Sequence, residues 1–286
     1  MSTADLRFVH DGINLSYRRD GNPSGPAILL LHGLSGISST YDEVVESLPT
    51  FDIYRIDLRG HGRSDRAPGT YQVPFYSGDV VAFVEAVIGR SLVLVGHSLG
   101  GVITHHIAAT RPDLVNAALC EDPPLYFCDQ SLFAQSIFAT VFPMILTAMR
   151  QMHADGAPRD EVRKFVANSP SPAGGIAADH QSPAAIESRV DAFLLCDPDV
   201  WEPAIHGGAL SGYDPDAEIT CPITVLQADP ALGPALFPDH AERLRANLPH
   251  ATVALIDGAP HGIHSHTTAT ARYLQHLHSL LASAEA

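Results

Sequence analysis

The strongest chemical signal in the chain is a serine between two glycines. The segment Gly96-His97-Ser98-Leu99-Gly100 matches the pattern G-x-S-x-G and stands between a β-rich run, Leu92–Val95, and a helical run that begins at Leu99. A serine in such a sharp strand-to-helix turn takes a strained backbone conformation that exposes its Oγ. The helix N-terminus adds backbone N–H groups and a positive dipole end. The pattern therefore predicts nucleophilic chemistry at Ser98.

Three further segments accompany this turn. His32-Gly33-Leu34-Ser35-Gly36 follows a buried apolar run, Asp57-Leu-Arg-Gly-His-Gly-Arg-Ser64 follows the next strand-like run, and Gly258-Ala-Pro-His261 lies near the end. In sequence and in order, the four segments resemble the α/β-hydrolase superfamily. The resemblance implies an α/β fold with a mostly parallel twisted sheet of about eight strands, flanked by helices and carrying an inserted helical cap. It specifies the fold far better than the substrate.

The resemblance also assigns roles to particular residues. A serine nucleophile needs a general base, since its hydroxyl is too weakly acidic to ionise near neutral pH. The matching residue is His261, which is selected by its place among the 16 His of the chain. The backbone N–H groups of Leu34 and Leu99 match the oxyanion donors. The turn from Asp57 to Ser64 is expected to organise loops, and His264 to support the site or face solvent.

The acid that orients the histidine has two candidates. The usual position in the family follows the strand after the inserted segment, where the chain reads Gln227-Ala-Asp229-Pro, but Asp229 falls earlier than the usual spacing. Some relatives, including certain haloalkane dehalogenases and resorcylic-lactone hydrolases, carry the acid at the end of the strand after the elbow helix. Here that place holds Glu121-Asp122-Pro123-Pro124. We favour Asp122 and keep Asp229 as the alternative.

Charge and cysteine content narrow the classes of partner. The chain has 32 Asp+Glu against 17 Lys+Arg and a formal net charge of -15, and such a surface repels phosphate backbones and anionic lipids. We therefore expect a small-molecule substrate, no nucleic acid and no membrane insertion, and leave a homodimer open. The four cysteines are far apart and no histidines have convincing metal spacing, so we expect no metal and no cofactor. The start, Met1–Val9, lacks a secretory pattern, which favours a cytoplasmic location.

The elements that must position these residues alternate between strand and helix, which is typical of a parallel sheet covered on both faces. Helices are expected over Leu99–Thr110, near Asp239–Asn247 and around Thr268–Leu281. Two more are predicted from capping residues, one at Thr40 and one at Asp79. The expected strands are Leu6–Val9, Ile13–Tyr17, Ala27–Leu31, Ile53–Ile56, Leu92–Val95, Val115–Cys120, Pro222–Gln227 and Val253–Ile256.

The rhythm changes after Pro123-Pro124. Residues 124–217 give helical runs broken by Pro- and Gly-rich stretches, and no convincing strand. We predict a core domain over 1–123 and 218–286 and an inserted helical cap over 124–217 that covers Ser98. The substrate-binding residues predicted from this arrangement are Gly33, His97, Phe127, Phe138 and Trp201. The apolar inventory of the insert, which favours a hydrophobic or aromatic substrate group, comprises Phe127, Phe133, Phe138, Phe142, Met144, Met149 and Trp201.

The reaction that fits best is hydrolysis of a carboxylic ester or lactone of a hydrophobic small molecule through an acyl-enzyme. The resemblance leaves two other reactions open: hydrolysis of a C–C bond in a ring-cleavage product, and cofactor-free oxygenation. Dehalogenase and epoxide hydrolase chemistry is disfavoured, because those relatives carry Asp where this chain has Ser98. The non-enzymatic alternative is a receptor-like protein that binds a small ligand. The intact Ser98, His261 and oxyanion segment count against it.

Overall fold

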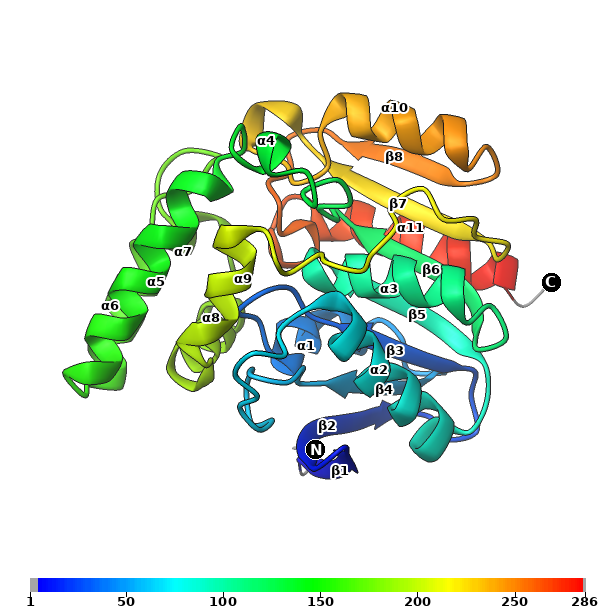
Figure 1. The fold of residues 1–286 in the computed structure, drawn as a ribbon, viewed down its shortest axis with the longest axis horizontal. Coiled ribbons are helices and arrows are strands. Elements are labelled where there is room, and N and C mark those ends of the chain that lie inside the picture. The colour runs from blue at the N-terminus through cyan, green and yellow to red at the C-terminus, as the bar shows by residue number, and fades with distance from the viewer. Residues whose placement is uncertain (1–4, 285–286) are drawn as a thin grey trace.

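A mostly parallel sheet runs through the computed structural model, which describes residues 5–284. Its eight strands are β1 (Leu6–His10), β2 (Ile13–Gly21), β3 (Ala27–Leu31), β4 (Asp52–Ile56), β5 (Leu92–His97), β6 (Val115–Glu121), β7 (Ile223–Ala228) and β8 (Thr252–Ile256). They lie in the order β1-β2-β4-β3-β5-β6-β7-β8 (Figure 1). The β1–β2 and β2–β4 pairs are antiparallel, and β4 to β8 run parallel. This is the alpha/beta architecture expected from the sequence.

Helices pack on both faces of this sheet and also form the segment between β6 and β7. They are α1 (Asp42–Glu46), α2 (Val73–Phe83), α3 (Leu99–Thr110), α4 (Gln130–Phe133), α5 (Phe138–Ala154), α6 (Arg159–Ala167), α7 (Ala177–His180), α8 (Pro183–Leu195), α9 (Trp201–His206), α10 (Pro238–Asn247) and α11 (Thr270–Ala284). Short 3-10 turns lie at Ser38–Tyr41, Pro198–Val200, Pro230–Leu232 and Ile263–Ser265, and a π-helical turn extends α2 over Val84–Ile88. Within the described part of the chain, every helix is too short or too polar to cross a lipid bilayer.

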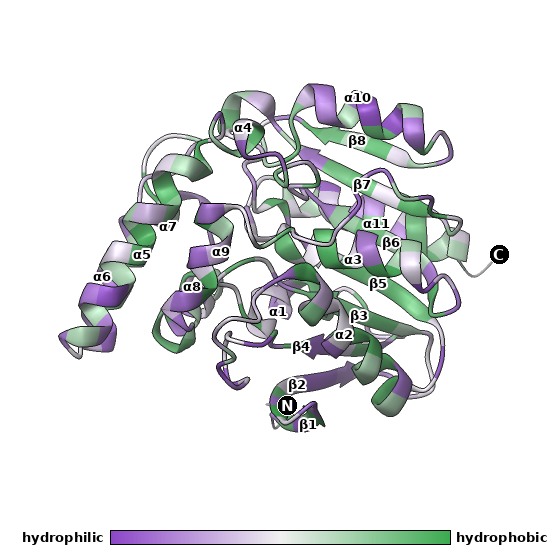
Figure 2. Ribbon diagram, viewed as in Figure 1, coloured by the Kyte–Doolittle hydropathy of each residue, from purple (hydrophilic) through white to green (hydrophobic). Residues whose placement is uncertain are grey.

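The central strands are apolar on both faces because both faces are buried. In β3, Leu29 and Leu31 join the core cluster that contains α2 and α3, whereas Ile28 and Leu30 join the cluster that contains α1 and α11. Figure 2 shows β5, β6 and β7 as largely hydrophobic and β2, which is near the sheet edge, as more polar. The carboxyl ends of these parallel strands meet at one edge of the sheet, and the candidate catalytic residues follow them.

The chain between β6 and β7 carries α4 to α9 and returns to the sheet at β7. In Figure 1 these helices stand to the left of the sheet. Their contacts bury Met149, Val162 and Phe193, whereas the side chain of Met144 is 65% exposed. The division into a core domain and a cap over 124–217 stays a prediction, and residues 1–4 and 285–286 of that predicted core lie outside the described part.

Two predicted helix starts were wrong. Residues 38–41 form a 3-10 turn before α1, and the Thr40 hydroxyl pairs with the ring of His264 at 3.0 Å in place of a capping bond. Asp79 lies inside α2, which begins at Val73 with a proline in its first turn. Its buried carboxylate accepts hydrogen bonds from Arg59 at 2.6 and 2.7 Å. In both cases a contact distant in sequence overrode a local capping signal.

Candidate active site

Ser98 occupies the tight turn between β5 and α3. Its backbone has φ 52 and ψ -116, and non-glycine residues rarely adopt such a positive φ. The turn closes because Gly96 and Gly100 lack side chains: a Cβ at Gly96 would lie 2.1 Å from the Gly100 carbonyl oxygen, and one at Gly100 would lie 2.2 Å from the Leu31 carbonyl oxygen. The Ser98 N–H donates to the Glu121 carbonyl at 2.9 Å, which ties the turn to β6.

The loop after β3 approaches this turn closely. A Cβ at Gly33 would lie 2.7 Å from His97 Nδ1 and 3.0 Å from Ser98 Cβ, so only glycine allows the approach. The buried ring of His32 fixes the loop: it donates from Nδ1 to the Gly33 carbonyl and accepts at Nε2 from the Leu58 N–H. Burial lowers the pKa of His32 to about 4, so the ring stays neutral as this hydrogen-bond pattern requires.

The turn that follows β4 supports the same loop. The Asp57 carboxylate accepts hydrogen bonds from the backbone N–H groups of Ser38 at 2.7 Å and Arg63 at 3.0 Å. It thereby holds the segment after the His32-Gly33 loop against the turn that contains Arg63. These contacts are structural, in line with the loop-organising role expected for this motif.

His261 and Asp122 meet at the carboxyl edge of the sheet. His261 Nδ1 donates to Asp122 Oδ2 at 2.6 Å, across 139 residues of sequence. The carboxylate is fully buried, and it also accepts from the backbone N–H groups of Ala228, Ala235 and Leu236 at 3.2, 2.8 and 3.2 Å. Since Nδ1 carries the proton in this bond, Nε2 is left as the basic nitrogen. Asp122 itself has φ 40, so its backbone is strained as well.

Asp229, the alternative acid, contacts backbone rather than an imidazole. Its carboxylate accepts from the N–H groups of Ala231 at 2.8 Å and Gly258 at 2.7 Å. These hydrogen bonds lower the pKa of Asp229. Its own N–H donates to the Ala259 carbonyl at 2.8 Å. Asp229 therefore anchors the loop that leads to His261.

A second acid–histidine pair adjoins the first, and sequence reasoning missed its acid. Glu121 accepts from His264 Nδ1 at 2.7 Å and from the His264 backbone N–H at 2.9 Å. Both side chains are buried, and the His264 ring stacks on Tyr41 with centroids 4.7 Å apart. Burial alone would raise the pKa of Glu121, but the nearby imidazoles of His264 and His97 and the hydrogen bonds lower it overall. The signal in the sequence was two adjacent carboxylates matched by two histidines spaced three apart.

His97 lies between the two pairs. Its ring centroid is 4.7 Å from that of His261 and 5.2 Å from that of His264. Its Nε2 lies 3.1 Å from the His261 carbonyl oxygen. Burial lowers the pKa of His97 to about 3, so the ring is a neutral spacer that packs the His261 loop against the elbow. His105, on α3, is also buried, where its Nδ1 lies 3.1 Å from the Tyr213 hydroxyl.

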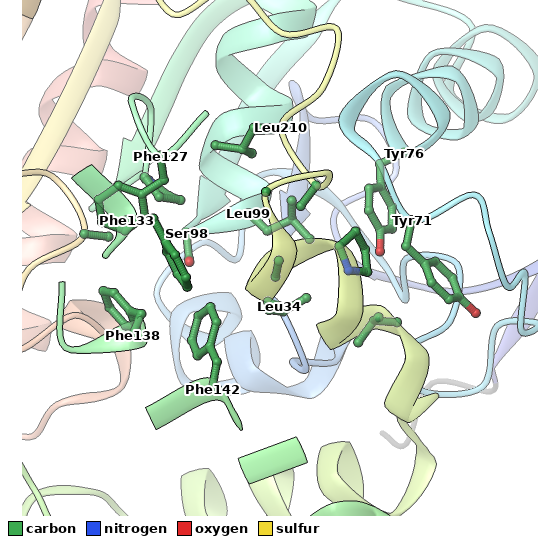
Figure 3. Close-up of a pocket in the computed structure, with 17 residues that line it drawn as sticks. Leu34, Tyr71, Tyr76, Ser98, Leu99, Phe127, Phe133, Phe138, Phe142 and Leu210 are labelled. Carbon is green, nitrogen blue, oxygen red and sulfur yellow. The ribbon is translucent and has the colours of Figure 1, made fainter. Parts of the chain in front are cut away.

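Ser98 opens onto a cavity of about 620 Å³, part of which is open to solvent. Figure 3 shows phenylalanines beside Ser98 and two tyrosines on the other side of the view. The ring of Phe138 lies 5.0 Å from that of His261, which links the wall to the histidine. The lining residues are Leu34, Tyr71, Tyr76, Ser98, Leu99, Pro124, Phe127, Phe133, Phe138, Phe142, Val200, Pro203, Ala204, Gly207, Ala209, Leu210 and Ala235. Among these described residues none is charged.

The predicted binding residues fall in two places. Phe127 and Phe138 line the cavity, as do the two predicted oxyanion residues Leu34 and Leu99. Trp201 packs behind the wall, with its ring 4.9 Å from that of Phe142. Gly33 and His97 lie against each other under the elbow. A substrate-binding role for all five of the predicted binding residues stays a prediction. Within residues 5–284, no group of three or more His, Cys, Asp or Glu is placed to hold a metal ion.

A family model described as alpha/beta hydrolase fold matches residues 26–266. The chain belongs to the alpha/beta hydrolase family. This alpha/beta hydrolase is 32% identical over 123 residues to the 2-(acetamidomethylene)succinate hydrolase of Mesorhizobium japonicum. That alignment covers 43% of this chain and 44% of that protein. It is 25% identical over 272 residues to the sn-1-specific diacylglycerol lipase ABHD11 of Xenopus laevis. That alignment covers 90% of this chain and 80% of that protein.

A solved structure has the same fold over nearly the whole of this chain. The enol-lactonase from Burkholderia xenovorans LB400 superposes with a TM-score of 0.71 at 20% identity, covering 97% of this chain and 100% of that chain. At this identity the likeness concerns the fold alone. The alignments to the first four curated relatives, which include the 2-(acetamidomethylene)succinate hydrolase, span only 33% to 44% of the length of those proteins.

Proposed function

We propose that this alpha/beta hydrolase cleaves a carboxylic ester or lactone of a hydrophobic small molecule through an acyl-enzyme. The observation that carries the proposal is the 2.6 Å hydrogen bond from His261 to the buried Asp122, with the His261 ring against Phe138 in the wall of the apolar cavity that Ser98 lines. In serine hydrolysis the acid holds the histidine in the correct tautomer and stabilises the imidazolium that forms. The relative named as a diacylglycerol lipase supports ester chemistry.

Acylation follows from these positions. Ser98 Oγ attacks the carbonyl carbon of the substrate while His261 Nε2 takes the hydroxyl proton. Asp122 stabilises the imidazolium that forms, without taking the proton itself. The backbone N–H groups of Leu34 and Leu99 bind the oxygen on which negative charge develops. Loss of one such donor typically costs about 10²–10³ in rate. The C–O bond then breaks, and His261 returns the proton to the departing alcohol oxygen.

Deacylation repeats the sequence with water. His261 Nε2 removes a proton from a water molecule, whose oxygen attacks the acyl carbon held by Ser98. The second tetrahedral intermediate collapses, Ser98 Oγ recovers the proton from His261, and the carboxylic acid leaves. For a lactone, the alcohol and the acid are the two ends of one released molecule.

The wall of the cavity supports a hydrophobic substrate. Phe127, Phe133, Phe138 and Phe142 surround the space beside Ser98, and they come from the segment that we propose as the cap over 124–217. Aromatic side chains bury large areas of an apolar group. The cytoplasmic location and the homodimer stay predictions.

The test is a covalent label. Wild type and Ser98→Ala are incubated with a fluorophosphonate, and the intact masses are recorded. We expect one adduct on wild type and none on the variant, and hydrolysis of p-nitrophenyl alkanoates by wild type only. An unlabelled wild-type protein would overturn the proposal and favour the receptor-like, ligand-binding alternative. A label without ester turnover would instead direct the search to C–C bond substrates.

A further inference from the structure

One polar group in the cavity has no part in the proposed reaction. Tyr76 extends from α2 and lines the cavity, and its side chain is 1% exposed. Its hydroxyl has no hydrogen-bond partner among the residues that the structure describes. Buried polar groups in proteins are nearly always paired, because an unpaired one loses its hydration without compensation. Other buried side-chain atoms in the described part of the chain also lack a partner, but Tyr76 is the residue among them that lines the cavity, and this position points to a ligand.

The neighbouring Tyr71 lines the same wall, and its hydroxyl differs from that of Tyr76 because it is fully hydrogen-bonded within the protein. The two rings stack with centroids 6.4 Å apart and an interplanar angle of 20°. The Tyr71 hydroxyl donates to the Asp197 carboxylate at 2.6 Å and accepts from the Ala67 N–H at 2.7 Å. Both of its hydrogen-bonding capacities are used within the fold. Packing of the wall thus explains Tyr71 completely and explains only the ring of Tyr76.

The surroundings specify what the Tyr76 hydroxyl would bind. Burial raises the pKa of Tyr76 well above its ordinary value, so the group remains an O–H donor at any physiological pH. The complementary ligand atom is an acceptor. None of the described lining residues is charged, so a carboxylate or phosphate oxygen would enter without a counter-charge, at a large desolvation cost. A neutral oxygen fits instead.

The position of Tyr76 separates this oxygen from the bond that is cleaved. In Figure 3 Tyr76 and Tyr71 lie on one side of the view, and Ser98 with Phe127, Phe133 and Phe138 on the other. Leu34, Leu99 and Leu210 also line the cavity and supply apolar contacts. A substrate that fills the cavity would reach Tyr76 with a part remote from the carbonyl that Ser98 attacks.

We propose that the Tyr76 hydroxyl is the polar end of the substrate pocket and donates a hydrogen bond to a neutral ketone, ether or hydroxyl oxygen that the substrate carries away from its scissile ester or lactone bond. The inference rests on the proposed function and narrows it to neutral oxygenated esters and lactones. It makes Tyr76 a specificity-determining residue.

The experiment compares esters that differ by one oxygen. One series consists of p-nitrophenyl oxoalkanoates with the ketone at successive carbons, each beside its parent alkanoate. A second series carries the ketone in the alcohol part and is followed by acid release. We expect wild type to prefer at least one oxo ester over its parent by about tenfold in kcat/KM, the scale of one neutral hydrogen bond. Tyr76→Phe should abolish that preference, so that the ratio of kcat/KM for the oxo ester to that for its parent falls to about one.

The control variant is Tyr71→Phe, which should lower the thermal midpoint and affect an oxo ester and its parent equally. Tyr76→Phe should instead match or exceed the wild-type midpoint, because it deletes an unpaired buried hydroxyl. A clearly lower midpoint for Tyr76→Phe would overturn the inference by showing that the hydroxyl serves the fold. So would the absence of any oxo preference in wild type, or its persistence in Tyr76→Phe.

These failures are distinguishable from failure of the proposed function. If wild type hydrolyses the parent esters and accepts the fluorophosphonate but shows no oxo preference, only the role of Tyr76 falls. If it neither takes the label nor cleaves any ester, both proposals fall together.

Discussion

Glu121 and Asp122 are neighbours at the end of β6, and each accepts a hydrogen bond from the Nδ1 of a different histidine. The distances are nearly equal, 2.7 Å for Glu121–His264 and 2.6 Å for Asp122–His261. Their surroundings differ. The His264 side chain is 2% exposed, and its Nε2 is paired with the Thr40 hydroxyl. The His261 side chain is 22% exposed, and its ring faces Phe138 in the cavity wall.

The comparison teaches that an acid–histidine contact alone does not define a catalytic pair. Both pairs have the chemistry of a fixed tautomer, but His264 has both ring nitrogens engaged in the fold. His261 is part-exposed and packs against Phe138, which lines the same cavity as Ser98. We therefore assign stability to the Glu121–His264 pair and propose catalysis for Asp122–His261. The two assignments predict opposite effects of the same type of substitution.

The largest expected effect is on the rate of the Asp122→Asn variant. An amide at this position disturbs the tautomer and no longer stabilises the imidazolium, so kcat for a p-nitrophenyl ester should fall by about 10⁴. The matched control is Asp229→Asn, which should retain kcat within about threefold because its carboxylate accepts hydrogen bonds from exposed backbone N–H groups and does not contact His261. Near wild-type turnover by Asp122→Asn, with a large loss in Asp229→Asn, would move the acid to Asp229.

The Glu121→Gln variant should reverse the pattern. Its amide places an N–H group against one of the two His264 N–H donors, so the free energy of unfolding in urea should fall by about 2–3 kcal/mol. The kcat should change by less than about tenfold. Thr40→Val, which removes the hydrogen bond on the opposite side of the His264 ring, is the milder companion and should cost about 1 kcal/mol. A collapse of kcat in a stably folded Glu121→Gln would contradict the division of roles.

The smallest expected effect at mildly acidic pH is a loss of folding stability. The pH range of this loss differs between the buried histidines and Glu121. Burial lowers the pKa of His32 to about 4 and that of His61 to about 3, from an ordinary 6.5. The unfolded chain therefore gains protons first, so stability is complete above pH 6.5 and falls as the pH decreases towards these values. Each such histidine should cost up to about 1.4 kcal/mol per pH unit.

The pKa of Glu121 is also lowered, from an ordinary 4.5. Its contribution is present above pH 4.5 and is lost as the pH falls through the folded-state pKa. The stability curves of wild type and Glu121→Gln, measured by urea unfolding at successive pH values, should therefore converge in strong acid. Parallel curves down to the lowest pH would show that ionised Glu121 does not stabilise the fold.

Much of the fold and part of the site were predictable because their signals are local. The elbow at Ser98 is encoded in five consecutive residues, and the helix expected over Leu99–Thr110 coincides with α3. The positions of the strands along the chain followed from short apolar runs, and all eight expected strands have counterparts in the sheet. Such features depend on residues close in sequence, whose geometry a pattern can carry.

The tertiary structure decided the matters that depend on distant residues. Asp122 and Asp229 are both aspartates at strand ends, and only the packing of β6 beside β7 shows which carboxylate meets His261. The sequence around Thr40 and Asp79 favoured helix caps. In the structure, however, the Thr40 hydroxyl pairs with His264 and the Asp79 carboxylate accepts hydrogen bonds from Arg59. The pairing of Glu121 with His264 joins positions 143 residues apart.

The cavity shows the same division. The sequence by itself predicted a nucleophilic turn, an oxyanion loop and an apolar insert. It could not determine that Phe127 and Phe138 line the cavity while Trp201 packs behind Phe142, or that the Tyr76 hydroxyl is buried there unpaired. The sequence specifies the chemical type of each side chain. Its access to a ligand depends on which distant surfaces exclude water from it, and only the folded packing sets that.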